Sequence, residues 1–396
     1  MRDSDLLRAY ARALRHVPRA PSPNGACTHA IAPYPPPPTH PALSHHHACQ
    51  PAGCPAAPCS EDQVRTGAYH AAIMRNKHLF KDKVVLDIGA GTGILSIFAA
   101  KAGARKVYAV EATAMAERAK LIIAANGLDG QIEVVRTMVE QLELEEKADV
   151  IISEWMGYML LREAMLDSVV KGRDKWLKEG GVMFPSHANV YLAPIRWGTH
   201  ERQSDQHDDA IEDWYGFVDE TKALYDLDLN CLNEQFEEET KEYFLQTSHW
   251  CELEKHHMVG PATKINSLDL RSCSVDDIQE LRSEFELSVT APGTDHIQGM
   301  VGWFDVDFDG SDQNPVEEKI TLTTGPGPRA EQTHWGQMAF LLHPPLPVSS
   351  GGKIKGSARI YKRGDNMRLL GMDSSLKVEK PDGSAGEARK VKWNVD

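Results

Sequence analysis

The stretch that decides the fold is VVLDIGAGTG, residues 84–93. Its apolar start predicts a short strand, and the apolar residues 94–100 that follow the glycines predict a helix. Glycines permit a tight turn there and let a ligand approach the backbone. A second apolar run, residues 106–110, ends in Glu111, about twenty residues beyond the glycines, where an acid commonly contacts a ribose hydroxyl. The sequence therefore predicts a nucleotide-type cofactor held by a strand–turn–helix–strand unit.

The spacing of these glycines indicates which class of nucleotide-type cofactor is expected. It is G-x-G-x-G, whereas the dinucleotide fingerprint that holds a pyrophosphate is G-x-G-x-x-G. Asp87 lies at the end of the first predicted strand and Glu111 follows the next one, so that two acids flank the turn. Many nucleotide-type cofactors use a glycine-rich unit of this kind, but these features favour an adenosyl cofactor without phosphates.

A pair of glutamates follows a third apolar run, residues 149–152, which predicts a buried parallel strand. Ligands of open α/β sheets bind at the carboxyl ends of the strands, so Glu154 and Glu163 are expected at a ligand site. A single glutamate on such a loop is usually a solvated surface acid. The apolar and aromatic side chains that bracket this pair are Trp155, Met156, Tyr158 and Met165. Two carboxylates in such surroundings suit a planar cation such as guanidinium, which offers five donors in a fork.

Length and patterning predict two domains. A chain of 396 residues is long for a single core. Residues 61–185 alternate short apolar runs with helical patterns, which predicts a mainly parallel sheet with helices on both faces. Residues 186–396 read as strands punctuated by glycine and proline, which is typical of an antiparallel barrel. Helical patterning at about 199–241 predicts a helical insertion in this second domain.

Composition limits the partners. The formal net charge is −14 at pH 7, so an acidic face is expected to attract basic, arginine-rich proteins. Solubility alone explains any one acidic cluster equally well. Tight binding of nucleic acid needs a basic face, and no apolar run in the sequence is long enough to span a membrane. We therefore expect protein partners, no direct contact with nucleic acid or membrane, and an intracellular location in the cytoplasm, the nucleus or both.

The first 60 residues differ from the rest of the chain. They are rich in alanine and proline, which predicts a disordered low-complexity segment. Four of the seven cysteines lie there, among several histidines. Their spacings match no zinc pattern, so no metal site is predicted. The scattered positions of the other three cysteines are typical of reduced intracellular thiols.

Three stretches together resemble the protein arginine methyltransferases. They are the glycine turn at 84–95, the double-acid loop at 153–163, and Thr333-His334-Trp335. The similarity begins at about Glu61, and it is greatest to the plant-type branch of the family. It implies a Rossmann-like domain that uses S-adenosylmethionine, followed by a barrel whose helical insertion is an arm that docks on a second copy in a homodimer. It also implies a type I enzyme, which makes monomethyl and asymmetric dimethyl arginine in substrates such as Arg-Gly-rich proteins or histone tails.

The resemblance also assigns residues to the cofactor. It implies that Arg65 holds the methionine carboxylate, that Glu111 holds the ribose hydroxyls, and that Val139 and Glu140 border the adenine edge. These roles suit the side chains, since arginine pairs bidentately with a carboxylate and acids accept hydrogen bonds from hydroxyls and amines. The cofactor-binding candidates are Arg65, Asp87, Gly89, Gly91, Glu111, Val139 and Glu140.

Glu154 and Glu163 are expected to grip the guanidinium of the substrate. An arginine side chain stays protonated at any working pH, and its nitrogen lone pairs are delocalised. A grip from two sides would orient one nitrogen and localise its lone pair, with one carboxylate accepting a proton. The resemblance pairs His334 with Asp62 as the route of that proton to solvent. The other substrate-pocket candidates are Met156, Tyr158, Met165 and Trp335.

The N-terminal segment departs from the family pattern. Family members carry a Tyr-Phe-x-x-Tyr helix just before the position of Glu61, where it folds over the cofactor, and this pattern does not occur here. Two interpretations therefore stay open: an active arginine methyltransferase, and a scaffold that keeps the fold but binds the cofactor poorly. A third, a methyltransferase for a small molecule or RNA or else a nicotinamide enzyme, is disfavoured by the double-acid loop and the Thr-His-Trp loop.

Overall fold

The computed structural model describes residues 62–395. The predictions for residues 1–60 were a disordered segment, no metal site and no lid helix of the family type. They lie outside the described residues, as does Glu61.

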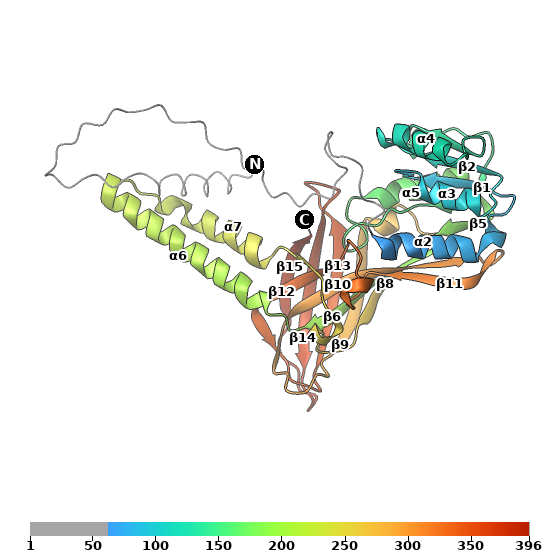
Figure 1. Ribbon diagram of the computed structural model, residues 1–396. Helices are drawn as coiled ribbons and strands as arrows, with labels where there is room; N and C mark the ends of the chain where they lie inside the picture. Colours follow the sequence, from blue (N-terminus) through green and yellow to red (C-terminus); the bar gives the residue numbers. More distant parts are fainter. Residues whose placement is uncertain (1–61, 396) are drawn as a thin grey trace, which may run out of the picture. The chain divides into compact units, whose positions relative to one another are not determined.

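A five-stranded parallel sheet forms the first half of the described chain (Figure 1). Its strands are β1 (Val84–Ile88), β2 (Lys106–Val110), β3 (Ile132–Val135), β4 (Ala148–Ile152) and β5 (Leu177–Phe184). The helices of this half are α2 (Gln63–Arg75), α3 (Ile94–Lys101), α4 (Met115–Ala125) and α5 (Met165–Trp176). Every residue of β1 is buried, as expected of an apolar strand that is covered on both faces. The prediction of a parallel sheet is confirmed.

The strand order β3-β2-β1-β4-β5 determines where a ligand binds. The chain runs outward from β1 to β3 and then returns to the other side of β1, so the order reverses between β1 and β4. Ligands of such sheets bind at this switch point, outside the carboxyl ends of the strands. Asp87 of β1 is paired in register with Ile152 of β4. The glycine turn and the double-acid loop therefore leave the sheet next to each other.

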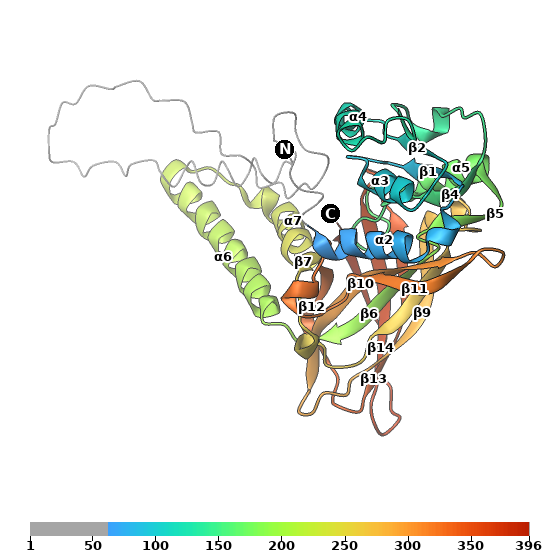
Figure 2. The same ribbon diagram turned by 45° about the vertical axis from the view of Figure 1, so that its right-hand side comes forward.

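The second half is an antiparallel barrel built from two sheets (Figure 2). One sheet has the order β7-β12-β10-β6-β8 with β11 paired to β10, and the other has the order β15-β14-β13-β9. The strands are β6 (His187–Ile195), β7 (His249–Cys251), β8 (Thr263–Asp269), β9 (Glu280–Ser288), β10 (His296–Gly310), β11 (Pro315–Thr323), β12 (Gln337–Pro347), β13 (Lys353–Lys362), β14 (Leu370–Glu379) and β15 (Arg389–Val395). Side chains of both sheets share one apolar core, which is the predicted barrel arrangement.

Helix α2 joins the two halves. It lies along β11 in both views (Figures 1 and 2). The fully buried Asn76, which follows the helix, accepts hydrogen bonds from the amides of Glu317 and Glu318 at 2.8 Å and 3.0 Å. Its own amide nitrogen donates to Glu318 O at 2.9 Å. One asparagine thus fastens the end of α2 to the barrel.

The helical insertion consists of α6 (Thr199–Tyr225) and α7 (Asn233–Leu245), so it ends after the predicted residue 241. Residues 214–236 belong to a compact unit separate from the one that holds the sheets. Within this unit Trp214 stacks on Phe236, with 4.5 Å between the ring centroids. Its indole nitrogen donates to Asn233 Oδ1 at 2.9 Å. Trp214 is therefore part of the core of the insertion itself.

Candidate active site

Hydrogen bonds from three parts of the chain hold the start of the double-acid loop. Ser153 Oγ donates to Ile88 O, at the end of β1, at 2.7 Å. Tyr69, which is buried on α2, donates its hydroxyl to Ser153 O at 2.8 Å. Trp335 Nε1 donates to Met156 O at 2.9 Å. The loop is therefore fixed at once by the sheet, by α2 and by the barrel.

The rest of the double-acid loop has an unusual backbone. Four residues other than glycine have positive φ angles: Met159 at 48°, Leu160 at 72°, Glu163 at 81° and Ala164 at 60°. Each such residue costs about 1–3 kcal/mol and persists only where the surrounding structure holds it. Gly157 is required because a Cβ there would lie 2.0 Å from Arg162 O. Strain of this kind clusters at functional sites.

Glu154 forms an ion pair with Arg65 of α2. Arg65 Nη1 lies 3.2 Å from Glu154 Oε2, and 25% of the glutamate side chain is exposed. Burial raises the pKa of Glu154 above its usual value, Arg65 and His334 oppose the shift, and Glu163 adds to it. The influence of Glu163 on Glu154 means that the loop brings the two carboxylates to one site. Arg65, which was expected at the methionine carboxylate, lies beside the first of them.

His334 of the barrel forms a hydrogen-bonded pair with Asp62 at the start of α2. Its Nδ1 lies 2.7 Å from Asp62 Oδ2, and its backbone amide donates to the same oxygen at 3.0 Å. The other oxygen, Oδ1, caps α2 by accepting from the amide of Arg65 at 2.8 Å. Burial by itself would raise the pKa of Asp62, but these hydrogen bonds outweigh it, so this pKa lies below its usual value. An ionised Asp62 keeps the proton of His334 on Nδ1 and leaves Nε2 to exchange protons.

The glycine turn folds under the carboxylate of Glu111. Oε2 of Glu111 accepts from the amide of Gly91 at 3.0 Å, and Oε1 accepts from that of Thr113 at 2.8 Å. The φ angles of Gly89 and Gly91 are +74° and +54°, a region that favours glycine. A Cβ at Gly89 would lie 2.2 Å from Met165 Cε. The side chain of Met165 therefore packs directly against the backbone of the turn, which only glycine permits at this position.

Asp87 carries a buried acceptor that has no donor in the described part of the chain. Oδ2 accepts from Ser96 Oγ at 2.6 Å, whereas Oδ1 has no partner among residues 62–395. Burial raises the pKa of Asp87 to about 7, which the bond from Ser96 opposes and Glu111 reinforces. A buried acceptor without a donor is costly. A ligand with a donor group would complete this site, so the residues present fit an adenosyl cofactor.

Val139 and Glu140 lie in a short 3-10 helix, η2 (Val139–Gln141), that packs against α5. Val139 is buried, and its side chain fills the space that a Cβ at Gly172 would need. Glu140 Oε1 accepts from Ser168 Oγ at 2.7 Å and lies 3.9 Å from Lys171 Nζ. Both residues therefore contact α5 in this structure.

The remaining pocket candidates line the same loop. Met156 is buried, with its sulfur 3.7 Å from the hydroxyl of Tyr69. Tyr158 lies under the guanidinium of Arg162, whose central carbon is 5.3 Å from the ring centroid. Met165, the first residue of α5, faces the glycine turn. Trp335 contacts His334, with 4.0 Å between the ring centroids.

Three residues that hold the candidate residues were not predicted from the sequence: Tyr69, Ser96 and Arg368. Tyr69 lies four residues after Arg65, a spacing that puts both on one face of a helix and was the available signal. Ser96 follows the glycine turn, but nothing in the sequence distinguishes it from other helical serines. Arg368 accepts a hydrogen bond from the amide of Glu163 at 2.8 Å through its carbonyl oxygen. No local sequence pattern predicts this hydrogen bond, because Glu163 and Arg368 lie on segments that are far apart in the chain.

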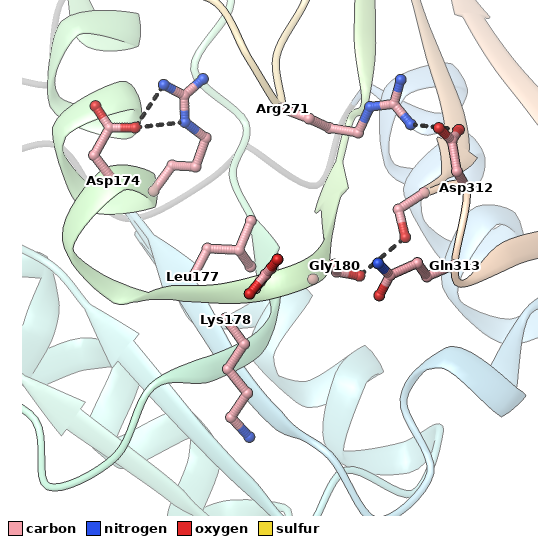
Figure 3. A pocket seen from close by; sticks show the side chains of 11 residues that line it. Asp174, Leu177, Lys178, Gly180, Arg271, Asp312 and Gln313 are labelled. Carbon is pink, nitrogen blue, oxygen red and sulfur yellow. Dashed lines mark hydrogen bonds and ion pairs between the residues drawn. The ribbon is translucent and has the colours of Figure 1, made fainter.

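A cavity of about 370 Å³ is lined by residues of α5, β5 and the barrel, away from these residues (Figure 3). Its lining consists of Arg173, Asp174, Leu177, Lys178, Glu179, Gly180, Gly181, Arg271, Ser311, Asp312 and Gln313. Charges around it are paired, as Arg271 is with Asp312 at 3.4 Å. Within residues 62–395, no three His, Cys, Asp or Glu side chains are grouped to hold a metal ion. None of the helices described there has both the length and the apolar composition needed to cross a bilayer.

Comparisons with known proteins agree with this geometry. Residues 186–381 match the family model of the arginine methyltransferase oligomerization subdomain, and residues 73–186 match that of the ribosomal protein L11 methyltransferase. The chain is 42% identical over 337 residues to protein arginine N-methyltransferase PRMT10 of Arabidopsis thaliana, which covers 85% of this chain and 87% of that protein. This chain belongs to the protein arginine methyltransferase family. The protein of the same name from Oryza sativa subsp. japonica is 44% identical over 322 residues, covering 81% of this chain and 84% of that protein.

Solved structures of arginine methyltransferases share the fold. The crystal structure of Arabidopsis thaliana protein arginine methyltransferase 10, described as a uniquely open conformation, aligns with a TM-score of 0.83 at 41% identity and covers 85% of this chain and 96% of that one. The Trypanosoma brucei PRMT1 enzyme–prozyme heterotetrameric complex with AdoHcy aligns with a TM-score of 0.70 at 29% identity, with the same coverage of both chains.

Membership of the family confirms several predictions. The chain is a protein arginine methyltransferase with a Rossmann-like domain followed by a barrel, and its cofactor is S-adenosylmethionine. The match to an oligomerization subdomain indicates an oligomer. A nicotinamide enzyme, one form of the third interpretation, is thereby excluded.

Proposed function

We propose that this arginine methyltransferase makes monomethyl and asymmetric dimethyl arginine, with Glu154 and Glu163 clamping the guanidinium of a protein substrate. One observation carries the proposal above the others. Two carboxylates, of which Glu163 contributes to the raised pKa of Glu154, lie on a strained, anchored loop at the switch point of the sheet. Such strain is retained where it serves a site, and a forked cation is the ligand that two carboxylates suit.

The cofactor residues suit the parts of S-adenosylmethionine, which supplies an electrophilic methyl group on its sulfonium. Glu111, already beside the glycine turn, would accept from ribose hydroxyls, and Asp87 offers its unpartnered oxygen. Val139 and Glu140 would border the adenine. Arg65 would hold the methionine carboxylate, which it can bind while it stays near Glu154.

The clamp would activate the substrate by position and charge. A guanidinium gripped by Glu154 and Glu163 keeps one nitrogen oriented, and its positive charge is drawn toward the opposite nitrogens. Burial raises the pKa of Glu154, which makes that carboxylate a better proton acceptor than an ordinary glutamate. His334, whose side chain is 35% exposed, is placed to pass the proton to solvent with Asp62 as its partner. Met156, Tyr158, Met165 and Trp335 would exclude water around the guanidinium.

The substrates we propose are Arg-Gly-rich proteins or histone tails, because a chain with a net charge of −14 favours encounter with basic segments.

The oligomer we propose is a homodimer through the helical insertion. On α6 and the turn after it, Tyr215, Leu224, Tyr225 and Leu227 are exposed. On α4, Leu121 is 73% exposed beside the exposed Ile122. Exposed apolar side chains of this kind mark interaction surfaces. If the helical insertion of one copy packed on α4 of the other copy, both sets of side chains would be buried.

Mass spectrometry of an Arg-Gly-rich peptide incubated with the full chain and S-adenosylmethionine tests the activity. We expect a gain of one and then two methyl groups, with the fragments of asymmetric dimethylarginine. Glu154→Gln and Glu163→Gln should each lower kcat by about 100-fold or more, since each removes one side of the grip. Glu284→Gln, at an exposed position on β9, is the matched control.

Two outcomes would contradict the proposal. Full turnover by Glu154→Gln would exclude the carboxylate clamp. A full chain that shows no heat of S-adenosylmethionine binding in calorimetry, and no methyl transfer, would instead support the scaffold interpretation that the sequence of residues 1–60 left open.

A further inference from the structure

The loop between β13 and β14, residues 363–369, holds the second carboxylate of the clamp from the barrel side. The amide of Glu163 donates to Arg368 O at 2.8 Å. Arg368 Nη2 lies 3.9 Å from Glu163 Oε2, and Arg162 Nη1 lies 3.9 Å from Glu163 Oε1. Thus a backbone hydrogen bond fixes Glu163 at its φ angle of 81°, while each of its carboxylate oxygens faces a guanidinium of the chain itself.

Two neighbouring cations at this end of the hairpin have closer acidic partners. Lys362 pairs with Asp167 of α5, and the side chain of this lysine is only 2% exposed. Arg363 binds Asp365 in the same loop, at 2.9 Å and 2.6 Å. Arg368 differs because 60% of its side chain is exposed and because its contact with Glu163 is longer than a hydrogen bond. Of these three cations, Arg368 is therefore the one that a competing ligand displaces most easily.

Arg162, the second cation at Glu163, is held more firmly. Only 11% of its side chain is exposed, and its guanidinium lies over the ring of Tyr158. A cation over an aromatic face in a desolvated place is bound more tightly than an exposed ion pair. When a substrate guanidinium reaches Glu163, Arg162 therefore stays in place beside this carboxylate, whereas Arg368 can move away.

We propose that Arg368 is a specificity-determining residue, whose guanidinium shares Glu163 with the guanidinium of the substrate and must release this carboxylate before the substrate is gripped. The proposal rests on the proposed clamp role of Glu163. Arg368 acts through Glu163 and through its own positive charge beside that carboxylate, so it weakens the binding of peptides that carry many cations. Its backbone contact with Glu163 is independent of the side chain.

The balance of the two interactions favours this exchange. An exposed ion pair at 3.9 Å contributes little and is screened by salt. A substrate guanidinium binds a carboxylate with two parallel hydrogen bonds, which is a stronger and more directional contact. The substrate guanidinium therefore displaces Arg368 from Glu163, and the free energy that this displacement costs raises KM. The chemical step is unaffected, because Arg368 is no longer at Glu163 when the substrate is in place.

Steady-state kinetics of Arg368→Ala in the full chain test this proposal, with an Arg-Gly-rich peptide as substrate. We expect KM for the peptide to fall about threefold to tenfold at low ionic strength. We expect kcat to stay within about twofold, because the backbone bond that holds Glu163 is retained. Arg368→Lys, which keeps the charge, should remain near the parent KM. Lys353→Ala removes the same charge at the opposite end of β13, about 30 Å away at the rise of a strand, and should leave KM unchanged.

Salt dependence and the Glu163→Gln background separate this inference from the clamp itself. The KM advantage of Arg368→Ala should shrink as ionic strength rises. If Glu163→Gln turns over like the parent, the clamp is wrong. If Glu163→Gln is impaired but Arg368→Ala behaves like Lys353→Ala, or raises KM, only the role of Arg368 is wrong. Peptide affinity, measured by calorimetry with S-adenosylhomocysteine present, should improve in Arg368→Ala and change much less when the same substitution is made in Glu163→Gln.

Discussion

The two ends of the active site are assembled over very different distances along the chain. At the cofactor end, Glu111 accepts a hydrogen bond from Gly91, which is 20 residues away. At the acceptor end, His334 binds Asp62 across 272 residues. The part of the cofactor site formed by Glu111 and the glycine turn, called the cradle here, therefore depends on a single strand–turn–helix–strand unit, whereas the guanidinium clamp depends on the barrel being packed against that unit. Changes to the clamp should slow transfer without loosening the cofactor, and changes to the cradle should do the reverse.

The largest effect should follow Gly157→Ala, which disturbs the acceptor end by shape alone. The new Cβ would lie 2.0 Å from Arg162 O, so the double-acid loop must move. A displacement of about 1 Å at a catalytic group costs about 100-fold in rate, and we expect a loss of at least this size in kcat. S-adenosylmethionine affinity, measured by calorimetry, should stay within about threefold. Gly130→Ala, where a Cβ meets nothing within 4 Å, is the control. An equal loss of cofactor affinity would show that the two ends are not separable.

His334→Gln should have the next largest effect. The side chain that exchanges protons is removed, but the bond from the backbone amide of residue 334 to Asp62 can remain. We expect kcat to fall about 10-fold to 100-fold, at the lower end of what acid–base groups contribute, with cofactor affinity retained. The pH dependence of kcat gives a second measurement. Loss of a proton relay changes the shape of the pH profile, whereas a packing defect lowers kcat by the same factor at every pH. His256→Gln, at an exposed histidine, should leave both measurements unchanged.

Glu111→Gln disturbs the other end. The amide nitrogen that replaces one carboxylate oxygen cannot accept a hydrogen bond, so the variant loses one of the two bonds from Gly91 and Thr113 together with the negative charge. We expect the Kd for S-adenosylmethionine to rise about tenfold, as for the loss of a charged acceptor. At saturating cofactor, kcat should stay within about twofold. Glu145→Gln, at an exposed position, is the matched control. A fall in kcat larger than the change in Kd would contradict the separation of the two ends.

The last effect concerns stability rather than the reaction and follows from the buried Asp87. Its pKa is about 7 in the folded chain and 3.8 in an ordinary setting, so the folded state binds this proton more tightly. The stability that this proton provides is complete below pH 4, declines as the pH rises toward 7, and is gone above it. Asp87→Asn does not titrate. Without cofactor, denaturant unfolding should show the variant gaining about 2 kcal/mol on the parent between pH 5 and pH 8. A difference that is flat with pH would contradict the burial of this charge.

Sequence reasoning was most successful where structure is local. The predicted strands at 84–88 and 106–110 coincide with β1 and β2, because short apolar runs between turns leave little choice of register. Glu154 became a candidate because it follows an apolar run that predicts a strand, whereas Asp62 became one through the resemblance. The resemblance also implied the pairing of Asp62 with His334. It did not imply the partner of Glu154, since Arg65 was expected at the cofactor and lies beside Glu154.

The sequence by itself determined the order of the two domains, the glycine turn with its flanking acids, and the presence of a double-acid loop. These features depend on apolar periodicity and on the φ angles that glycine allows, which act within a few residues. Only the tertiary structure decided that Glu163 is held by Arg368, that Tyr69 anchors Ser153, and that one oxygen of Asp87 has no partner in the described chain. The physical reason is that hydrogen bonds and desolvation depend on which distant segments fold together, and no local pattern carries that information.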